Sequence, residues 1–340
     1  MTSARVRRCL LALLAAALLP SAGVAQGVKI AVGDVGLGIG DVPRLDGLRL
    51  NFRDRHLERV RGVNVTLWEP YEGARGEVQG LAVGLPLTGA RTVEGLAVGA
   101  AVAVEDRFTG IGLAPLGFGA GERVRGIALA GLGIGGGGDL EGVMVGGIGL
   151  GVGGDIRGVA IGGVGAGGGG DLTGLGVGGV GLGMGGDLTG VAIGGIGVGA
   201  GGRVRGLAVG GVGVGVGGGA TGVTVGGVGV GSGGELRGLT LAGVGVGAPR
   251  LTGLTVSGIG AGAEEARGVV VAPAFFRIEE GGSLSGVSIS AFNDIQGRQR
   301  GLTIGLLNIT EELHGVQVGL LNIAWNKPSW RVLPLVNYHR

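Results

Sequence analysis

GVAIGGVGAGGGGDLT at residues 158–173 is followed by GLGVGGVGLGMGGDLT at 174–189 and GVAIGGIGVGAGGRVR at 190–205. Each segment opens with what we call a marker glycine. The sixteen-residue spacing holds at Gly126, Gly142, Gly158, Gly174, Gly190, Gly206, Gly222 and Gly238. With small slips it extends to Gly47, Gly62, Gly80, Gly95 and Gly110 before them and to Gly253, Gly268, Gly286, Gly301 and Gly315 after them. A short fixed period predicts one small unit stacked many times.

Each repeat reads as two short strands. Apolar residues alternate within 191–193 and again within 196–200, and this spacing of two is the strand period. The two runs are out of phase across Gly194-Gly195, so the sequence predicts a bend there, at glycines that tolerate positive φ. A helix is excluded because glycine at every second position costs about 1 kcal/mol each relative to alanine.

Two strands and two corners per repeat predict an all-β fold, a parallel β-solenoid of about 15–16 residues per coil. We expect its equivalent valines and isoleucines to form ladders in a narrow core. Asn293, Asn308 and Asn322 each follow a marker glycine by seven residues, which predicts an amide ladder.

The alternative is an antiparallel outer-membrane β-barrel in which each repeat supplies one strand. Such barrels carry aromatic girdles, whereas residues 119–274 contain no Phe, Trp or Tyr. A barrel lumen is also polar, whereas the residues between the valines are mostly glycine. Both observations favour the solenoid.

The order of these segments predicts five regions. They are a signal peptide at 1–25, an N-terminal cap with irregular coils at 26–79, a glycine-rich array at 80–285, asparagine-ladder coils at 286–323 and a C-terminal cap at 324–340. Aromatic residues are absent from 119–274, and we interpret those towards the two ends of the chain as cap residues, including Phe52, Trp68 and Tyr71 near the start and Trp325, Trp330 and Tyr338 near the end. The charged run 53–59 and the tail 326–340 are expected to shield the open ends.

Residues 1–25 combine basic residues, an apolar stretch and a small-residue cleavage site, which predicts export to the periplasm, outer membrane or cell surface. Removing them also removes Cys9 and three arginines, leaving 24 basic and 25 acidic residues and no cysteine. The remaining chain is near neutral, so charge gives no reason to expect a nucleic-acid partner. Disulfides and thiolate metal sites are excluded as well.

Asp139, Asp155, Asp171 and Asp187 recur at sixteen-residue intervals, so a solenoid stacks their carboxylates in a row. One interpretation is a row of calcium sites, since that ion prefers oxygen ligands. The other is that each aspartate accepts a backbone hydrogen bond in a corner. The GGxGxD calcium pattern is absent and the row ends at Arg203, so corner hydrogen bonding is the favoured interpretation and no cofactor is expected.

No catalytic motif emerges from the sequence. GxGxxG matches carry no information where glycine is this frequent, and no lysine follows one to reach a phosphate. His56, His314 and His339 are far apart in sequence with no nucleophile motif beside them, and we expect surface or cap positions for them. Only the aspartate row and cap charges such as Asp54 and Glu58 motivate an enzyme hypothesis, and the sequence predicts none.

The segment GLTIGLLNITEELHGVQVGLLNI at 301–323, with GLRLNF at 47–52 and GVNVTLW at 62–68, resembles the repeats of glycine-rich bacterial surface-repeat proteins of the spirochaete type and related exported proteins. The resemblance implies a surface or periplasmic role and transfers no catalytic residue. The function expected is therefore a non-enzymatic exported scaffold that is rigid and contacts an unknown surface or envelope partner, in adhesion or matrix contact. The alternative is an outer-membrane channel or anchor.

Overall fold

The computed structural model describes residues 27–68 and 75–340. All regular secondary structure in this part of the chain is β-strand. These described residues contain no helix that is long and apolar enough to span a bilayer. The chain divides into two units, residues 1–105 and 106–340, which we describe separately. The predicted signal peptide and Tyr71 lie outside the described residues.

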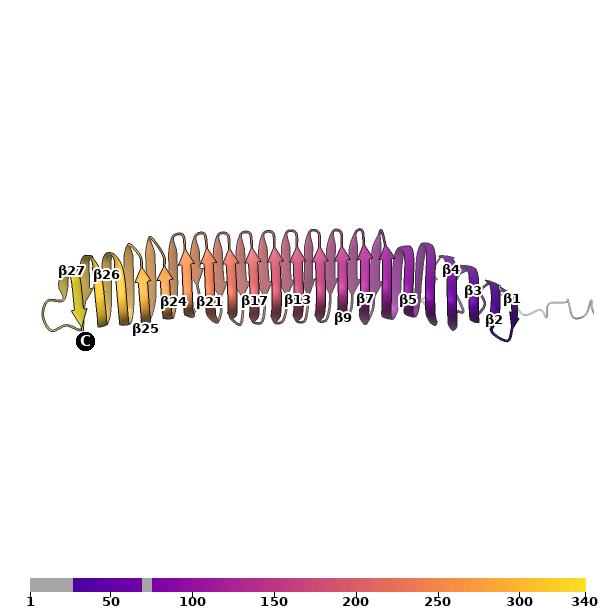
Figure 1. The fold of residues 1–340 in the computed structure, drawn as a ribbon, viewed down its shortest axis with the longest axis horizontal. Coiled ribbons are helices and arrows are strands. Elements are labelled where there is room, and N and C mark those ends of the chain that lie inside the picture. The colour runs from indigo at the N-terminus through magenta and orange to yellow at the C-terminus, as the bar shows by residue number, and fades with distance from the viewer. Residues whose placement is uncertain (1–26, 69–74) are drawn as a thin grey trace, which may run out of the picture. The chain divides into compact units, whose positions relative to one another are not determined.

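Between residues 117 and 257, each turn contains a long strand, a corner, a short strand and a second corner (Figure 1). The long strands are β7 (Arg123–Ala130), β9 (Asp139–Gly146), β11 (Ile156–Gly162), β13 (Leu172–Gly178), β15 (Leu188–Gly194), β17 (Val204–Gly210), β19 (Ala220–Gly226), β21 (Glu235–Ala242) and β23 (Arg250–Ser257). The short strands are β6 (Gly117–Ala120), β8 (Gly133–Gly136), β10 (Gly149–Val152), β12 (Gly165–Gly168), β14 (Gly181–Met184), β16 (Gly197–Ala200), β18 (Gly213–Val216), β20 (Gly229–Ser232) and β22 (Gly245–Gly247).

Equivalent strands of successive turns pair in parallel at one register. Ile156 of β11 pairs with Leu140 on one side and Leu172 on the other, each sixteen residues away. The short strands do the same, with Gly149 opposite Gly133 and Gly165. The predicted parallel β-solenoid is therefore confirmed, and the antiparallel barrel alternative is wrong.

The marker glycines have backbone conformations that few other residues adopt. From Gly47 to Gly301 each has φ between 109° and 150°. A Cβ at Gly158 would also lie 2.1 Å from the carbonyl oxygen of Gly142, the marker of the preceding turn. The sixteen-residue spacing therefore records a point in each turn where the fold requires glycine.

The bend predicted at Gly194-Gly195 is present, but the reason given for its glycines was wrong. Neither residue has positive φ. A Cβ at Gly194 would lie 2.0 Å from the oxygen of Gly197, and one at Gly195 would lie 1.8 Å from that of Gly179. Close backbone packing, rather than an unusual φ, requires glycine at this corner.

The predicted ladder of large aliphatic residues is present two residues before each marker, for example at the fully buried Ile156, but the middle of each long strand differs from the prediction. Ala160, Ala192 and Ala208, two residues after their markers, are fully buried, whereas the flanking Val159 and Ile161 face outward and are only partly buried. The size of the inward residue varies from turn to turn: Met144 occupies this position fully buried, whereas at Gly176 the side chain of Leu182 from the facing short strand fills the space. The residue two positions after the marker therefore faces inward, and the residues on either side of it face outward.

The last turns of the second unit are β24 (Gly260–Val271), β25 (Phe275–Ile289), β26 (Phe292–Ala324) and β27 (Val332–His339). The predicted amide ladder forms here. Asn293 donates to the Oδ1 atom of Asn308 and Asn308 donates to that of Asn322, both over 2.7 Å, and all three side chains are fully buried. Their amides pair directly with one another inside the core.

The C-terminal end closes with an antiparallel strand, since β27 pairs with the last part of β26. The cap interpretation implied that the aromatic residues there are buried, but this closure leaves them exposed. Trp325 is 52% exposed and Trp330 is 75% exposed. The backbone of β27 covers the last turn, and the two indole rings remain accessible.

The first unit contains β1 (Gly27–Val32), β2 (Val35–Gly40), β3 (Arg44–Arg53), β4 (Arg59–Trp68) and the beginning of β5 (Glu77–Ala114), which continues into the second unit. β1 pairs antiparallel with β2, and β2, β3 and β4 then stack in parallel. The strand β1 therefore covers the N-terminal edge. The charged run 53–59, expected to shield this edge, instead forms the corner between β3 and β4.

Candidate interaction surface

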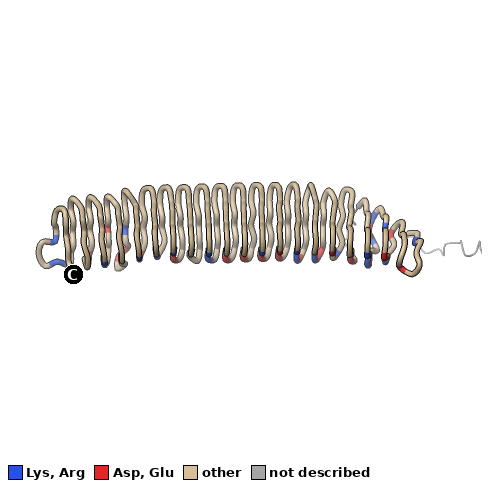
Figure 2. The backbone as a smooth tube through the Cα atoms, viewed as in Figure 1, with Lys and Arg blue, Asp and Glu red and all other residues tan. Residues whose placement is uncertain are grey.

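The charged residues of the glycine-rich turns share one corner. Between residues 106 and 267, every Asp, Glu, Lys and Arg lies one to four positions before a marker glycine. Figure 2 shows them along one edge of the stacked turns, with the opposite edge free of charge over these turns. We call this corner the charged edge.

The four predicted aspartates lie together on the charged edge and bond to the backbone of the following turn. Asp139 Oδ1 accepts a hydrogen bond from the backbone nitrogen of Asp155 over 3.0 Å, and Asp155 accepts one from Asp171 over 2.9 Å. Asp171 accepts an equivalent bond from the backbone nitrogen of Asp187, and Asp187 accepts one from that of Arg203, each over 2.7 Å. The bond from the nitrogen of Arg203, together with the charge of Arg205, lowers the pKa of Asp187 below its ordinary 3.8.

Arginines offset the repulsion between stacked carboxylates. Arg157 lies 2.6 Å from Asp155, and Arg205 lies 3.1 Å from Asp187. Among the described residues, no three His, Cys, Asp or Glu side chains form a group that could hold a metal ion. The geometry is the corner hydrogen bonding described above, and the calcium row stays an untested expectation.

The opposite corner carries a row of exposed apolar side chains, which we call the apolar edge. One residue of each turn, six positions after the marker, is between 42% and 54% exposed. The row consists of Leu116, Leu132, Ile148, Val164, Val180, Ile196, Val212, Val228, Val244 and Ile259. Its length sets it apart from the scattered apolar residues of an ordinary protein surface.

Beside the apolar edge, the outer side of the short strands consists of glycine. Each short strand reads Gly-x-Gly, with the middle side chain buried in the core and both glycines facing outward. We call this surface the glycine face; it contains the pairs 117/119, 133/135, 149/151, 165/167, 181/183, 197/199, 213/215, 229/231, 245/247 and 260/262. It is a strip of backbone without side chains.

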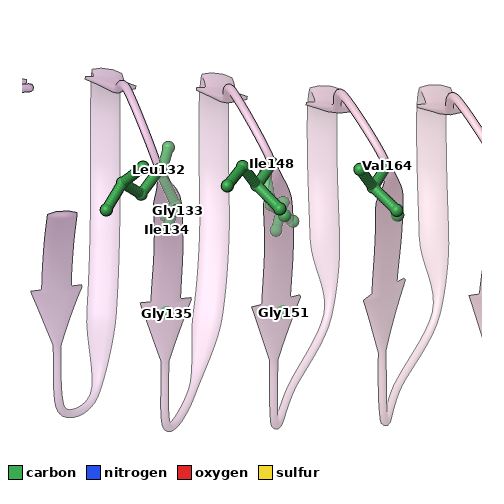
Figure 3. Close-up of a pocket in the computed structure, with 10 residues that line it drawn as sticks. Leu132, Gly133, Ile134, Gly135, Ile148, Gly151 and Val164 are labelled. Carbon is green, nitrogen blue, oxygen red and sulfur yellow. The ribbon is translucent and has the colours of Figure 1, made fainter. Parts of the chain in front are cut away.

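Over residues 132–165 the two features together form a shallow apolar hollow. In Figure 3, Leu132, Ile148 and Val164 project at the upper corner, and Gly135 and Gly151 lie lower on the short strands. The lining contains no charged or polar side chain. Such a surface can bind a flat, apolar, periodic partner, but it offers no group for acid–base or nucleophilic chemistry.

A buried ion-pair network in the first unit was missed by the sequence analysis. Arg49 is fully buried and donates to Asp41 and Asn64, each over 2.9 Å, and to Asp54. His56 Nδ1 lies 2.7 Å from Asp41 Oδ2. Arg49 and Asn64 each follow a marker by two residues, which is the inward position. Their spacing from the markers could therefore have shown that both polar side chains are buried.

This network joins the corner between β3 and β4 to the core. Its buried charges are paired, which makes it costly to break.

His314 and His339, far apart in sequence, lie with ring centroids 6.4 Å apart because β27 pairs with β26.

Comparisons of the chain with protein-family models, with curated proteins and with solved structures return no match. They therefore add nothing to the resemblance to bacterial surface-repeat proteins, which stays a prediction.

Proposed function

We propose that this protein is a non-enzymatic, exported structural repeat protein that acts as a rigid scaffold at the cell surface or envelope, in adhesion or matrix contact. The β-solenoid fold is consistent with a structural repeat protein. The role outside the cell is supported by residues 1–25, whose pattern is that of a secretory leader.

The observation that carries the proposal is the unbroken register of the central turns. Strands β7 to β21 pair with their neighbours at a constant sixteen-residue offset, without a bulge. Backbone hydrogen bonds therefore connect each turn to the next along the whole stretch. Such a stack resists bending and presents the same surface many times, which suits a scaffold that binds through repeated weak contacts.

Localisation tests the exported role. The full chain and a chain starting at Gln26 are expressed in a Gram-negative host, and cells are separated into cytoplasmic, periplasmic and membrane fractions. We expect the full chain to lose residues 1–25, seen by mass spectrometry, and to appear outside the cytoplasm, while the shorter chain stays inside. An unprocessed full chain that remains in the cytoplasm contradicts the proposal.

The scaffold role needs a second measurement, because export alone does not distinguish a scaffold from a secreted enzyme. Protease added to intact cells should release fragments of a surface-exposed protein, and cells carrying it should adhere more strongly to a matrix-coated surface. Removal of residues 174–189, one whole turn, should preserve adhesion, since the remaining turns present the same surface. Adhesion equal to that of cells lacking the protein would overturn the scaffold role.

A further inference from the structure

The fold does not require eight of the twenty glycines of the glycine face. At Gly135, Gly151, Gly183, Gly199, Gly215, Gly231, Gly247 and Gly262 an added Cβ would meet nothing within 4 Å, and none of them has a positive φ. They differ in this from the marker and corner glycines, where a Cβ would collide with backbone. A side chain would fit at each of them.

The C-terminal turns show side chains at the same register. Gly260 and Gly262 pair with Phe275 and Arg277 of β25, which in turn pair with Phe292 and Asp294 of β26. The two phenylalanine rings lie 5.4 Å apart, and Arg277 lies 2.8 Å from Asp294. This face of the solenoid therefore accepts large and charged side chains.

Ten successive turns nevertheless keep glycine there. Glycine within a strand costs roughly 0.5–1 kcal/mol relative to alanine because it loses more backbone freedom on folding. A glycine that the fold does not require marks a place where another backbone or a ligand approaches closely. We therefore attribute the glycines of this face to a contact made with another molecule.

We propose that the glycine face and the apolar edge of the second unit form an interface with the same surface of a second copy of this chain. Two glycine faces can approach more closely than the roughly 10 Å that separates sheets bearing side chains. The apolar side chains of each copy then cover the strip of the other. A contact between identical surfaces is isologous and closes as a dimer.

The spacing of the surface favours a second copy as the occupant. The apolar row repeats once per turn, about every 4.8 Å, and another copy of this chain has the same period. The charged edge lies outside the strip, so pairing buries no unpaired charge (Figure 2). Two copies therefore match in both period and polarity.

The available area is close to what a stable dimer needs. Ten turns at about 4.8 Å give a strip about 48 Å long, and four to five residues give a width of about 15 Å. Each copy then contributes on the order of 700 Å², compared with about 800 Å² per partner in a standard-size interface.

The test places arginine on the strip. Arg277 already occupies the register of Gly262, so Gly183→Arg and Gly199→Arg should fold while blocking close approach. The matched control is Thr173→Arg with Thr189→Arg, because Arg157 and Arg205 occupy equivalent positions on the charged edge. Circular dichroism, at a protein concentration where all chains are monomeric, should show the same β-structure and melting temperature for the wild-type chain and both double variants.

Sedimentation of residues 26–340 over about 1–100 µM gives the mass. We expect the wild-type chain and the control to sediment at twice the chain mass, and the dissociation constant of the glycine-face variant to rise at least about 100-fold. Wild-type protein at single-chain mass throughout, or a glycine-face variant that pairs as well as wild type, overturns the proposal. The proposal is also overturned if the protein is monomeric and floats together with phosphatidylcholine vesicles in a density gradient, because lipid would then cover the glycine face. None of these results depends on export, so this proposal and the scaffold role can fail separately.

Discussion

The glycine-faced turns β8 to β22 and the C-terminal turns β25 and β26 use the same backbone plan with different side chains. In the former the core is aliphatic and the outer side of the short strand is bare. In the latter asparagine and glutamine fill the core, and Phe275, Arg277 and Asp294 occupy the outer side. The comparison separates glycines that the turn requires from those that it merely tolerates.

The largest expected effect comes from changing the number of residues in the central turns. Deleting residues 174–189 joins Thr173 to Gly190, which reproduces the natural Thr189-Gly190 junction and preserves every register. Deleting residues 174–181 removes half a turn and brings unlike strands opposite each other. We expect the first deletion to fold with a cooperative urea transition and the second to cost more than about 5 kcal/mol. Equal stability of the two would show that register does not determine this fold.

The next effect distinguishes the two classes of glycine directly. Gly190 has φ of 120°, and its Cβ would lie 2.1 Å from the oxygen of Gly174, so Gly190→Ala should cost about 3 kcal/mol or more. Gly183 has open space around it, so Gly183→Ala should be neutral or stabilise by up to about 1 kcal/mol. Urea unfolding at a concentration where both chains are monomeric measures this. A costly Gly183→Ala would remove the argument for an external contact.

The asparagine ladder allows the C-terminal core to be tested against the aliphatic one. Asn308→Ala leaves the side-chain oxygen of Asn322 without its donor and removes one of three acceptors of the Asn293 amide, which we expect to cost about 1–3 kcal/mol in urea unfolding. Replacing all three asparagines with valine removes donors and acceptors together, as in the central turns.

The triple variant should therefore lose less stability per substitution than Asn308→Ala. A loss three times that of Asn308→Ala would mean that each amide contributes independently, contrary to a coupled ladder.

The sequence predicts those parts of the fold that depend on spacing. The marker glycines gave the turn length, and Asn293, Asn308 and Asn322 gave the amide ladder, because stacking places equivalent residues on one another. Alternation in the strands did not reveal which side faces inward. Ala160 rather than Ile161 faces the core, and Met144 occupies the same inward position one turn earlier, so the size of a residue does not show which side of the strand faces inward.

The candidate surface was less accessible to sequence reasoning for the same reason. The period shows that Gly183 and Gly190 both repeat, but only the folded structure shows that Gly183 has room for a side chain and Gly190 has none. The aspartate row could be placed from its period, while its hydrogen bonds needed the corner geometry. Trp330 was interpreted as a cap residue from its place near the end of the chain, yet its side chain is 75% exposed and β27 closes the end through its backbone.

The smallest effect concerns the charged edge, which continues past the point where the aspartates end. The backbone nitrogen of Arg203 donates to Asp187 and lowers the pKa of that carboxyl below 3.8. The carboxylate therefore stabilises the fold above pH 3.8, and this contribution is lost as the pH falls through the lowered pKa. Because the group is solvent-exposed, we expect less than about 1 kcal/mol.

Urea midpoints between about pH 2.5 and 6 should fall less steeply on acidification for Asp187→Asn than for the wild-type chain. Thr189→Asn, on the neighbouring position of the same edge, should leave the wild-type slope unchanged. An Asp187→Asn profile parallel to that of wild type would show that the hydrogen bond from Arg203 holds the neutral side chain as well as the carboxylate. The row of aspartates would then serve corner geometry alone, and charge would have no part in stacking these turns.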